Sequence, residues 1–170
     1  MLMQLDFDRP YAALLKQLET RAGGQEAVMV GIHTGGYWLA QRLHHDLQLS
    51  TPLAALNISH YRDDFDQIGL HPVVTPSQMP APIEGKTVIV VDDVLYTGRT
   101  IRAAMNELFD YGRPARIVLA VLIDRGGREL PIAADACGAQ ILLAADQNLV
   151  LDQDPASGGL RLRQEPTKTC

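Results

Sequence analysis

The fold of this chain is decided by residues 88–100, whose sequence is VIVVDDVLYTGRT. The first four of these residues form an apolar, β-branched run without polar alternation, which is typical of a strand buried on both faces of a parallel sheet. Two adjacent carboxylates, Asp92 and Asp93, follow directly and are predicted to end that strand. Open α/β sheets bind ligands at the carboxyl ends of their strands. We therefore expect an α/β protein with its site at this strand end.

Small and hydroxyl residues follow the acids, from Thr97 to Thr100, immediately before a predicted helix. Glycine lets free backbone N–H groups approach an anion, and a helix N-terminus favours phosphate. Two acids that suit sugar hydroxyls or a hydrated divalent cation, followed by a phosphate loop, match a ribose 5-phosphate. The competing interpretation is that Asp92 and Asp93 only cap the next turn and helix. The glycine and lysine positions of a Walker loop or a dinucleotide fingerprint are absent.

Strands and helices alternate on both sides of this stretch. Upstream, residues 27–32 and 53–58 have the length and composition of strands, and a small polar turn, HTGG at 33–36, separates the first of them from residues with helical spacing. Downstream, Ile101, Ala104, Met105, Leu108 and Phe109 are predicted to share one helical face, and a further strand is expected at 117–123.

A first helix is expected over residues 8–19, with Asp8 as its N-cap. Because parallel neighbours need crossover connections, the alternation predicts a mostly parallel sheet with helices on both faces, in a single domain over residues 1–170. Residues 59–84 are rich in proline and charge and have no apolar period. A loop this long in a compact domain is usually functional or disordered.

Composition narrows the class of protein. The net charge of −5 and the pI near 5.4 give no global positive field that would attract nucleic acid. The two cysteines, Cys137 and Cys170, have no metal-ligand spacing, and we expect Cys137 to be buried. No apolar run approaches the ~18 residues needed to cross a bilayer, and residues 1–10 lack the pattern of a signal peptide. These features predict a cytoplasmic protein.

Residues 88–100 resemble the signature with which type I phosphoribosyltransferases bind 5-phosphoribosyl-1-pyrophosphate (PRPP). The longer stretch 88–131, which includes GRP at 112–114 and DRGGRELP at 124–131, is similar to the PyrR family, as are GIHTGG at 31–36 and YRDD at 61–64. The resemblance implies the type I phosphoribosyltransferase fold, with a flexible lid loop at about 59–84 and a small hood. It also implies transfer of ribose 5-phosphate from PRPP to uracil, which gives UMP and pyrophosphate.

The resemblance assigns roles to individual residues. PRPP would be bound by Asp92, Asp93, Val94, Leu95, Tyr96, Thr97, Gly98, Arg99 and Thr100. Its pyrophosphate would lie on Thr34, Gly35 and Gly36, the lid would include Tyr61, Arg62 and Asp63, and the base would meet main-chain groups near Ile123, Asp124 and Arg125. Asp92, Asp93 and Arg62 are the expected catalytic residues, and Mg²⁺ is the expected cofactor, held by Asp92 and Asp93 through water. Family members often carry Arg where this chain has Gly35, so this charge contact to pyrophosphate is either missing here or supplied by another residue, such as Arg62.

Two alternatives stay open. The donor signature is shared with transferases for orotate, adenine and hypoxanthine, so uracil rests on the resemblance at 124–131. A PyrR protein can also act as a regulator that binds leader RNA, but this chain has Ala12, Ala13 and Lys16 where such relatives carry Thr, Arg and His on the first helix. Arg128, Arg161 and Arg163 are the other RNA candidates. The family also implies a homo-oligomer of dimers or larger, and His33 has no assigned role.

Overall fold

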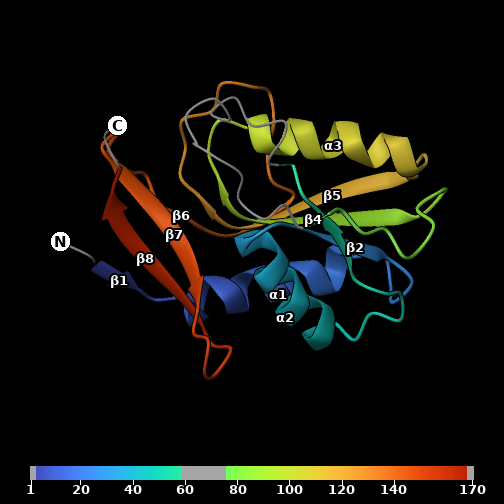
Figure 1. Ribbon diagram of the computed structural model, residues 1–170, viewed down its shortest axis with the longest axis horizontal. Coiled ribbons are helices and arrows are strands. Elements are labelled where there is room, and N and C mark those ends of the chain that lie inside the picture. Colours follow the sequence, from blue (N-terminus) through green and yellow to red (C-terminus); the bar gives the residue numbers. More distant parts are fainter. Residues whose placement is uncertain (1–2, 59–75, 168–170) are drawn as a thin grey trace.

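The computed structural model describes residues 3–58 and 76–167 of the 170-residue chain. In that part of the chain the main sheet has five strands in the order β3-β2-β4-β5-β6, and every neighbouring pair is parallel (Figure 1). The strands are β2 (Val28–Ile32), β3 (Ala54–Leu56), β4 (Thr87–Leu95), β5 (Arg116–Asp124) and β6 (Ala136–Gln140). The predicted parallel α/β sheet is therefore confirmed, with β4 at its centre.

The two faces of β4 pack against different helices, as the side-chain alternation of a strand requires. Ile89 and Val91 belong to the core cluster that contains α1 (Asp8–Arg21) and α2 (Gly35–Asp46). Val88 and Val90 belong to the opposite cluster, which contains α3 (Arg99–Tyr111). Figure 1 shows α1 and α2 on one side of the sheet and α3 on the other. The absence of polar alternation at 88–91 follows from burial on both faces.

Two local predictions about the helices are wrong. The N-cap of α1 is Phe7, not Asp8, and the carboxylate of Asp6 accepts the backbone N–H groups of Asp8 and Arg9 at 3.0 and 3.3 Å. On α3, Phe109 is 55% exposed, although Ile101, Ala104 and Leu108 are buried as expected. Phe109 lies about 100° around the helix from Leu108, beyond the arc that contacts the sheet.

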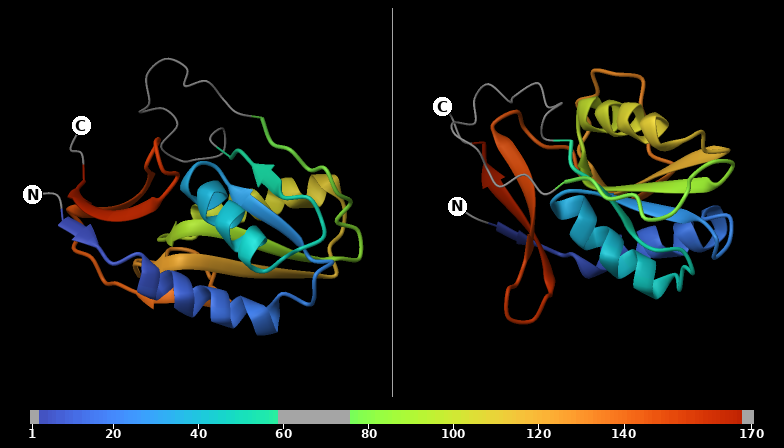
Figure 2. Two further views of the ribbon diagram at one scale, coloured as in Figure 1. Left: turned by 90° about the horizontal axis from the view of Figure 1, so that it is seen from below. Right: turned by 45° about the vertical axis from the view of Figure 1, so that its right-hand side comes forward.

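A second, antiparallel sheet forms the expected hood, with strands in the order β1-β8-β7. These strands are β1 (Met3–Leu5), β7 (Gln147–Gln153) and β8 (Leu160–Pro166). Figures 1 and 2 show it standing at one end of the main sheet, beside the N-terminus. Leu149, Leu151 and Leu162 anchor the hood in the core cluster of α1 and α2. The hood thus shares a core with the main sheet.

The described end of the predicted lid loop, residues 76–84, lies on the main sheet. Gln78 exchanges two backbone hydrogen bonds of 2.8 Å with Ala55 of β3, and Ile83 is fully buried. Residues 59–75, which contain Tyr61, Arg62 and Asp63, lie outside the described residues. No helix in the described ranges is long and apolar enough to cross a membrane.

Helix α1 covers the free edge of the main sheet at β6. The side-chain amide of Gln17 accepts the N–H of Cys137 at 3.2 Å and donates to its carbonyl at 2.7 Å, which satisfies backbone groups that an edge strand would expose. Because β6 is this edge strand, Cys137 is only half-buried, contrary to expectation. Gly138 permits the approach: a Cβ there would lie 2.5 Å from the carbonyl oxygens of both Leu122 and Pro10.

We expect Gly138→Ala to lower the free energy of unfolding by about 1–3 kcal/mol, because neither neighbouring backbone atom can move without displacing α1 or β5. Urea denaturation of the variant and the wild type measures this. The matched control is Gly159→Ala, since a Cβ at that exposed turn meets only the Ser157 hydroxyl, at 3.2 Å. Equal stability of all three proteins would contradict the close packing of α1 on β6.

Candidate active site at the carboxyl edge of the parallel sheet

Three loops meet where β2, β4 and β5 end. We call residues 33–36 the glycine loop, residues 92–100 the donor loop and residues 124–130 the base loop. The strands that carry them are hydrogen-bonded neighbours, with Gly31 opposite Val91 and Leu95 opposite Asp124. Because all three strands run in the same direction, their loops emerge at one edge of the sheet, where open α/β sheets bind ligands.

The two predicted acids lie within β4, not after it, because the strand continues to Leu95 by pairing with β5. The Asp92 side chain is 5% exposed, and its Oδ1 accepts the backbone N–H of Asp93 at 2.9 Å. Oδ1 of Asp93 accepts the N–H of Val94 at 2.9 Å. One oxygen of each carboxylate thus accepts a backbone N–H within β4, whereas the following helix, α3, has Gly98 as its N-cap and no side-chain cap hydrogen bond, so these bonds do not support the capping interpretation.

The glycine loop packs directly on these acids. A Cβ on Gly36 would lie 2.6 Å from the carbonyl oxygen of Val91 and 2.9 Å from Cα of Asp92. A Cβ on Gly35 would lie 2.3 Å from Oδ2 of Asp93, so the carboxylate lies where a side chain at position 35 would begin. Helix α2 starts at Gly35 with Thr34 as its N-cap, which directs backbone N–H groups and the positive end of the helix dipole toward the acids. The structure therefore brings the predicted pyrophosphate loop and the predicted acids together.

The donor loop ends in a second helix N-terminus, that of α3. Gly98 is its N-cap and has a left-handed backbone, with φ of +94°, which favours glycine. The hydroxyl of Thr97 accepts the N–H of Arg99 at 3.2 Å. Among the described residues the edge therefore carries two helix N-termini, at α2 and α3, on either side of two carboxylates. That arrangement suits a ligand with an anionic group at each end and hydroxyls between them.

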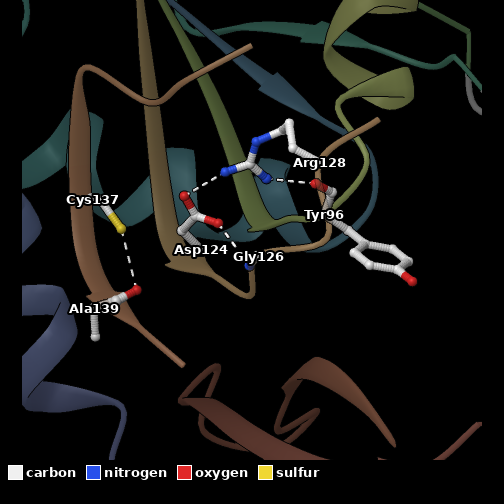
Figure 3. A network of polar contacts seen from close by, with 6 residues as sticks. All are labelled: Tyr96, Asp124, Gly126, Arg128, Cys137 and Ala139. Carbon is white, nitrogen blue, oxygen red and sulfur yellow. Dashed lines mark hydrogen bonds and ion pairs between the residues drawn. The ribbon is translucent and has the colours of Figure 1, made fainter. Parts of the chain in front are cut away.

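The base loop is bound along the donor loop by hydrogen bonds. The N–H of Arg125 donates to the carbonyl of Leu95 at 3.0 Å, and those of Glu129 and Leu130 donate to the carbonyl of Thr97 at 3.0 and 3.1 Å. Arg128 bridges the carboxylate of Asp124, at 2.6 Å, and the carbonyl of Tyr96 (Figure 3). The guanidinium of Arg128 thus ties the base loop to the donor loop.

Arg125 and Arg128 are not the solvent-facing surface charges that an unspecific turn would carry. Arg125 is 7% exposed, and the Arg128 side chain is 24% exposed. Burial opposes ionisation of the Asp124 carboxyl, but hydrogen bonds from Arg128 and from the Gly126 N–H outweigh it and hold the pKa of Asp124 below its usual value. Ile123 is fully buried, so its side chain belongs to the core.

His33 and Cys137 also lie near this edge of the sheet. His33 stacks on Tyr37 with ring centroids 4.6 Å apart, and burial lowers the pKa of His33, which keeps the imidazole neutral at pH 7. Cys137 donates to the carbonyl of Ala139 at 3.2 Å, and burial raises the pKa of its thiol (Figure 3). In the described part of the chain no group of three or more His, Cys, Asp or Glu residues could hold a metal ion.

Two residues that approach the site from the hood are not predictable from any motif in the sequence. Asn148 and Gln147 of β7 accept hydrogen bonds from the guanidinium of Arg125 at 3.2 and 2.9 Å. They lie more than twenty positions after Arg125, in another sheet, and no motif includes them. Only the fold places them at this edge.

Comparison with known proteins identifies the family and the fold of this chain. Residues 7–146 match the model of the phosphoribosyl transferase domain. A relative in Nitrosococcus oceani is 51% identical over 154 residues, which cover 88% of this chain and 87% of that protein, and one in Ralstonia nicotianae is 48% identical over 96% of both chains. Both are called bifunctional protein PyrR.

Solved structures show the same fold at low sequence identity. A hypoxanthine-guanine phosphoribosyltransferase from Bacillus anthracis superposes with a TM-score of 0.65, at 21% identity, covering 82% of this chain and 83% of that chain. A purine phosphoribosyltransferase from Pyrococcus horikoshii gives a TM-score of 0.60 at 26% identity, covering 81% and 85%. The expected type I fold is confirmed by these likenesses together with the parallel sheet.

The Asp124–Arg128 pair should make the free energy of unfolding depend on pH. Because the pKa of Asp124 is lower in the folded than in the unfolded chain, the pair stabilises the fold above about pH 4. That contribution is lost as the pH falls through the folded pKa. We expect Asp124→Asn to lower the free energy of unfolding by about 1–3 kcal/mol at pH 7, and the deficit to shrink as the pH falls through the folded pKa of Asp124. Urea denaturation across this range measures the difference, and a deficit independent of pH would contradict the assignment.

Proposed function

Because this chain belongs to the PyrR family of phosphoribosyltransferases, we propose that it transfers ribose 5-phosphate from PRPP to uracil, at the edge formed by the glycine, donor and base loops. The observation that carries the proposal is the contact of the glycine loop with the acids. A Cβ on Gly36 would overlap the backbone at Val91 and Asp92, and one on Gly35 would overlap the Asp93 carboxylate. The loop that would bind pyrophosphate therefore lies against two carboxylates at one sheet edge.

The donor would span this edge from one helix N-terminus to the other. Its 5′-phosphate would lie on the N-terminus of α3, with Thr97 to Thr100 as donors, and its pyrophosphate would lie on Thr34 to Gly36 at the N-terminus of α2. The ribose hydroxyls would then donate to Asp92 and Asp93, which lie between the two helix ends. Val94, Leu95 and Tyr96 would line this path through their backbone, because they join the acids to the phosphate loop.

The acids also suit Mg²⁺, the expected cofactor. Magnesium is usually bound by one or two carboxylates together with substrate phosphates and water, and this edge supplies two adjacent carboxylates without a larger ligand cluster among the described residues. Asp92 and Asp93 would hold the ion through water. When bound, it would neutralise charge on the departing pyrophosphate.

The reaction joins N1 of uracil to the anomeric carbon of the ribose while the bond from that carbon to pyrophosphate oxygen breaks, and the N1 proton is lost. The transition state has oxocarbenium character, and negative charge accumulates on pyrophosphate. Backbone N–H groups at Thr34 to Gly36 lie in place before the reaction, so they stabilise that charge without rearranging. Positioning therefore contributes more than a nucleophilic side chain, and no residue is assigned as a catalytic base.

Closure of the site is assigned to the lid. Arg62, with Tyr61 and Asp63, would cover the donor, exclude water that would hydrolyse it, and bring a positive charge to pyrophosphate. That charge matters here because Gly35 supplies none. These three residues lie outside the described part of the chain, so their role rests on the resemblance alone.

Base recognition would use main-chain groups of the base loop. The Asp124 carboxylate already accepts hydrogen bonds from Arg128 and from the Gly126 N–H. The Arg125 guanidinium is directed to β7, and Ile123 is enclosed in the core. Backbone N–H and C=O groups near these residues are therefore what the uracil edge would meet, and they suit a base that offers donors and acceptors on one edge.

Regulation of pyrimidine genes is the second function, and its support is the bifunctional description of relatives about 50% identical. We propose leader RNA as the means. Arg128, Arg161 and Arg163 would serve only after leaving carboxylate partners, since they pair with Asp124, Asp154 and Asp152 respectively. A homo-oligomer is proposed on the same family ground, and the exposed Leu142 is available to such an interface. We also propose that the protein acts in the cytoplasm.

The direct test of the base is turnover. Purified protein with Mg²⁺ and PRPP is supplied in parallel with uracil, orotate, hypoxanthine or adenine, and nucleotide formation is measured by chromatography. We expect UMP from uracil and no nucleotide from the other bases. Formation of a purine nucleotide or of orotidine monophosphate, without UMP, would contradict the assignment of uracil.

The acids are tested by Asp93→Asn, which keeps the shape of the side chain and removes its charge. We expect kcat/KM for PRPP to fall by about 10²–10³, the usual effect of removing one electrostatic group from a transition-state site. The control is Asp110→Asn, at an exposed position near the end of α3, which should leave the rate unchanged. A wild-type rate in Asp93→Asn would remove the acids from the mechanism.

A further inference from the structure

The side chain of Arg125 is buried among three parts of the site, although a surface loop would normally expose it. It is 7% exposed, and a buried charge is stable only when its surroundings satisfy it. No carboxylate among the described residues forms a salt bridge with it. Its neighbours are neutral groups: an amide, a carbonyl and an aromatic ring. Two hydrogen bonds and one ring contact, rather than a salt bridge, therefore hold this side chain in place.

The two ends of the guanidinium contact the hood. Nη1 donates to the side-chain oxygen of Asn148 at 3.2 Å, and Nη2 donates to the backbone carbonyl of Gln147 at 2.9 Å. Both acceptors lie at the start of β7, so the Arg125 side chain joins the base loop to the hood. The third donor, Nε, is buried and has no acceptor in the described part of the chain.

The flat face of the same guanidinium contacts the donor loop. Its central carbon lies 4.0 Å from the centroid of the Tyr96 ring, a cation–π contact. The ring is also held by Gly127, where a Cβ would lie 2.3 Å from Cε2 of Tyr96. Tyr96 directly precedes Thr97, the first residue of the phosphate loop. A shift of the phosphate loop would therefore move the ring against the guanidinium.

We propose that Arg125 is a positioning residue that couples the donor loop to hood strand β7, so that PRPP and uracil tighten each other's binding. The inference rests on the proposed transferase and adds cooperativity between its two substrates. Arginine suits this role because its planar group presents hydrogen bonds at its edge and a stacking surface on its face at the same time. PRPP that orders the donor loop then also orders the base loop for uracil, and the reverse holds. By linkage, each ligand raises the affinity for the other by the same factor.

The deciding experiment compares wild type with Arg125→Lys, which keeps the charge but cannot stack flat on Tyr96 while donating to both acceptors. Hydrogen exchange of the segment 144–151 is measured with and without Mg·PRPP, which contacts only the donor side. In the wild type we expect Mg·PRPP to slow exchange in this hood segment, and in Arg125→Lys we expect that response to vanish. A merely structural Arg125 would alter the baseline exchange but leave the response intact, and that result would overturn the proposal.

Steady-state kinetics give the second readout. In the wild type, saturating uracil should lower the KM for PRPP by about fivefold or more, within the usual range of coupling between sites, and in Arg125→Lys this ratio should approach one. The matched control is Arg42→Lys, another arginine stacked on a tyrosine, 4.3 Å from the Tyr11 ring, on the opposite helix layer from α3. It should keep the wild-type ratio. The same loss in both variants would overturn the proposal.

A milder variant guards against misfolding of Arg125→Lys. Asn148→Ala removes one acceptor on β7 and leaves both arginine and tyrosine in place, so it should reduce the coupling ratio and the exchange response in part. A full wild-type response in Asn148→Ala would overturn the proposal. Failure of the wild type to form UMP would instead overturn the proposed function, and it is distinguished by turnover alone.

Discussion

The contact of two glycines with residues 91–93 of β4 is the constraint on which the rest of the site depends. Because β2 and β4 are hydrogen-bonded parallel neighbours, the loop after β2 turns directly above these residues. There is no room for a side chain at Gly36, since a Cβ would meet the backbone of Val91 and Asp92. The start of α2 therefore comes close enough to Asp92 and Asp93 for one ligand to reach both. The order of the strands, the direction of α2 and the lack of side chains at Gly35 and Gly36 together allow this close contact.

On the other side of the site, hydrogen bonds attach the base loop to the donor loop. The carbonyl groups of Leu95, Tyr96 and Thr97 accept hydrogen bonds from Arg125, Arg128 and the backbone at 129–130. An unpaired carbonyl in this partly buried position would cost free energy, so the pairing fixes the path of both loops. The donor loop thus has a rigid support on the base side, while on the glycine side Asp92 is buried and Asp93 is partly exposed. Such prior ordering lowers the entropy that a ligand must otherwise remove.

The sequence predicted the features that depend on local pattern. The apolar run at 88–91 indicated a strand buried on both faces, and the two core clusters confirm it. The end of β4 was misplaced because Val94 and Leu95 continue the strand only by pairing with β5, a contact that is not local. The sequence points to Asp8 as the N-cap of α1, but the N-cap is Phe7, and the carboxylate of Asp6 accepts the N–H groups of Asp8 and Arg9. The contact of Arg125 with Asn148 was missed because the hood is brought to the base loop by tertiary packing alone.

The glycine loop lies so close to the acids that a single added side-chain carbon at Gly36 would push the two apart. The measurement that tests this most directly is the affinity of Gly36→Ala for Mg·PRPP, by isothermal titration calorimetry beside the wild type, with folding of both checked by urea denaturation. We predict binding weaker by about tenfold or more, because the added carbon lies 2.6 Å from the Val91 carbonyl and must displace the loop from Asp92 and Asp93. Wild-type affinity in a folded Gly36→Ala would contradict the claim that these two loops form one donor site.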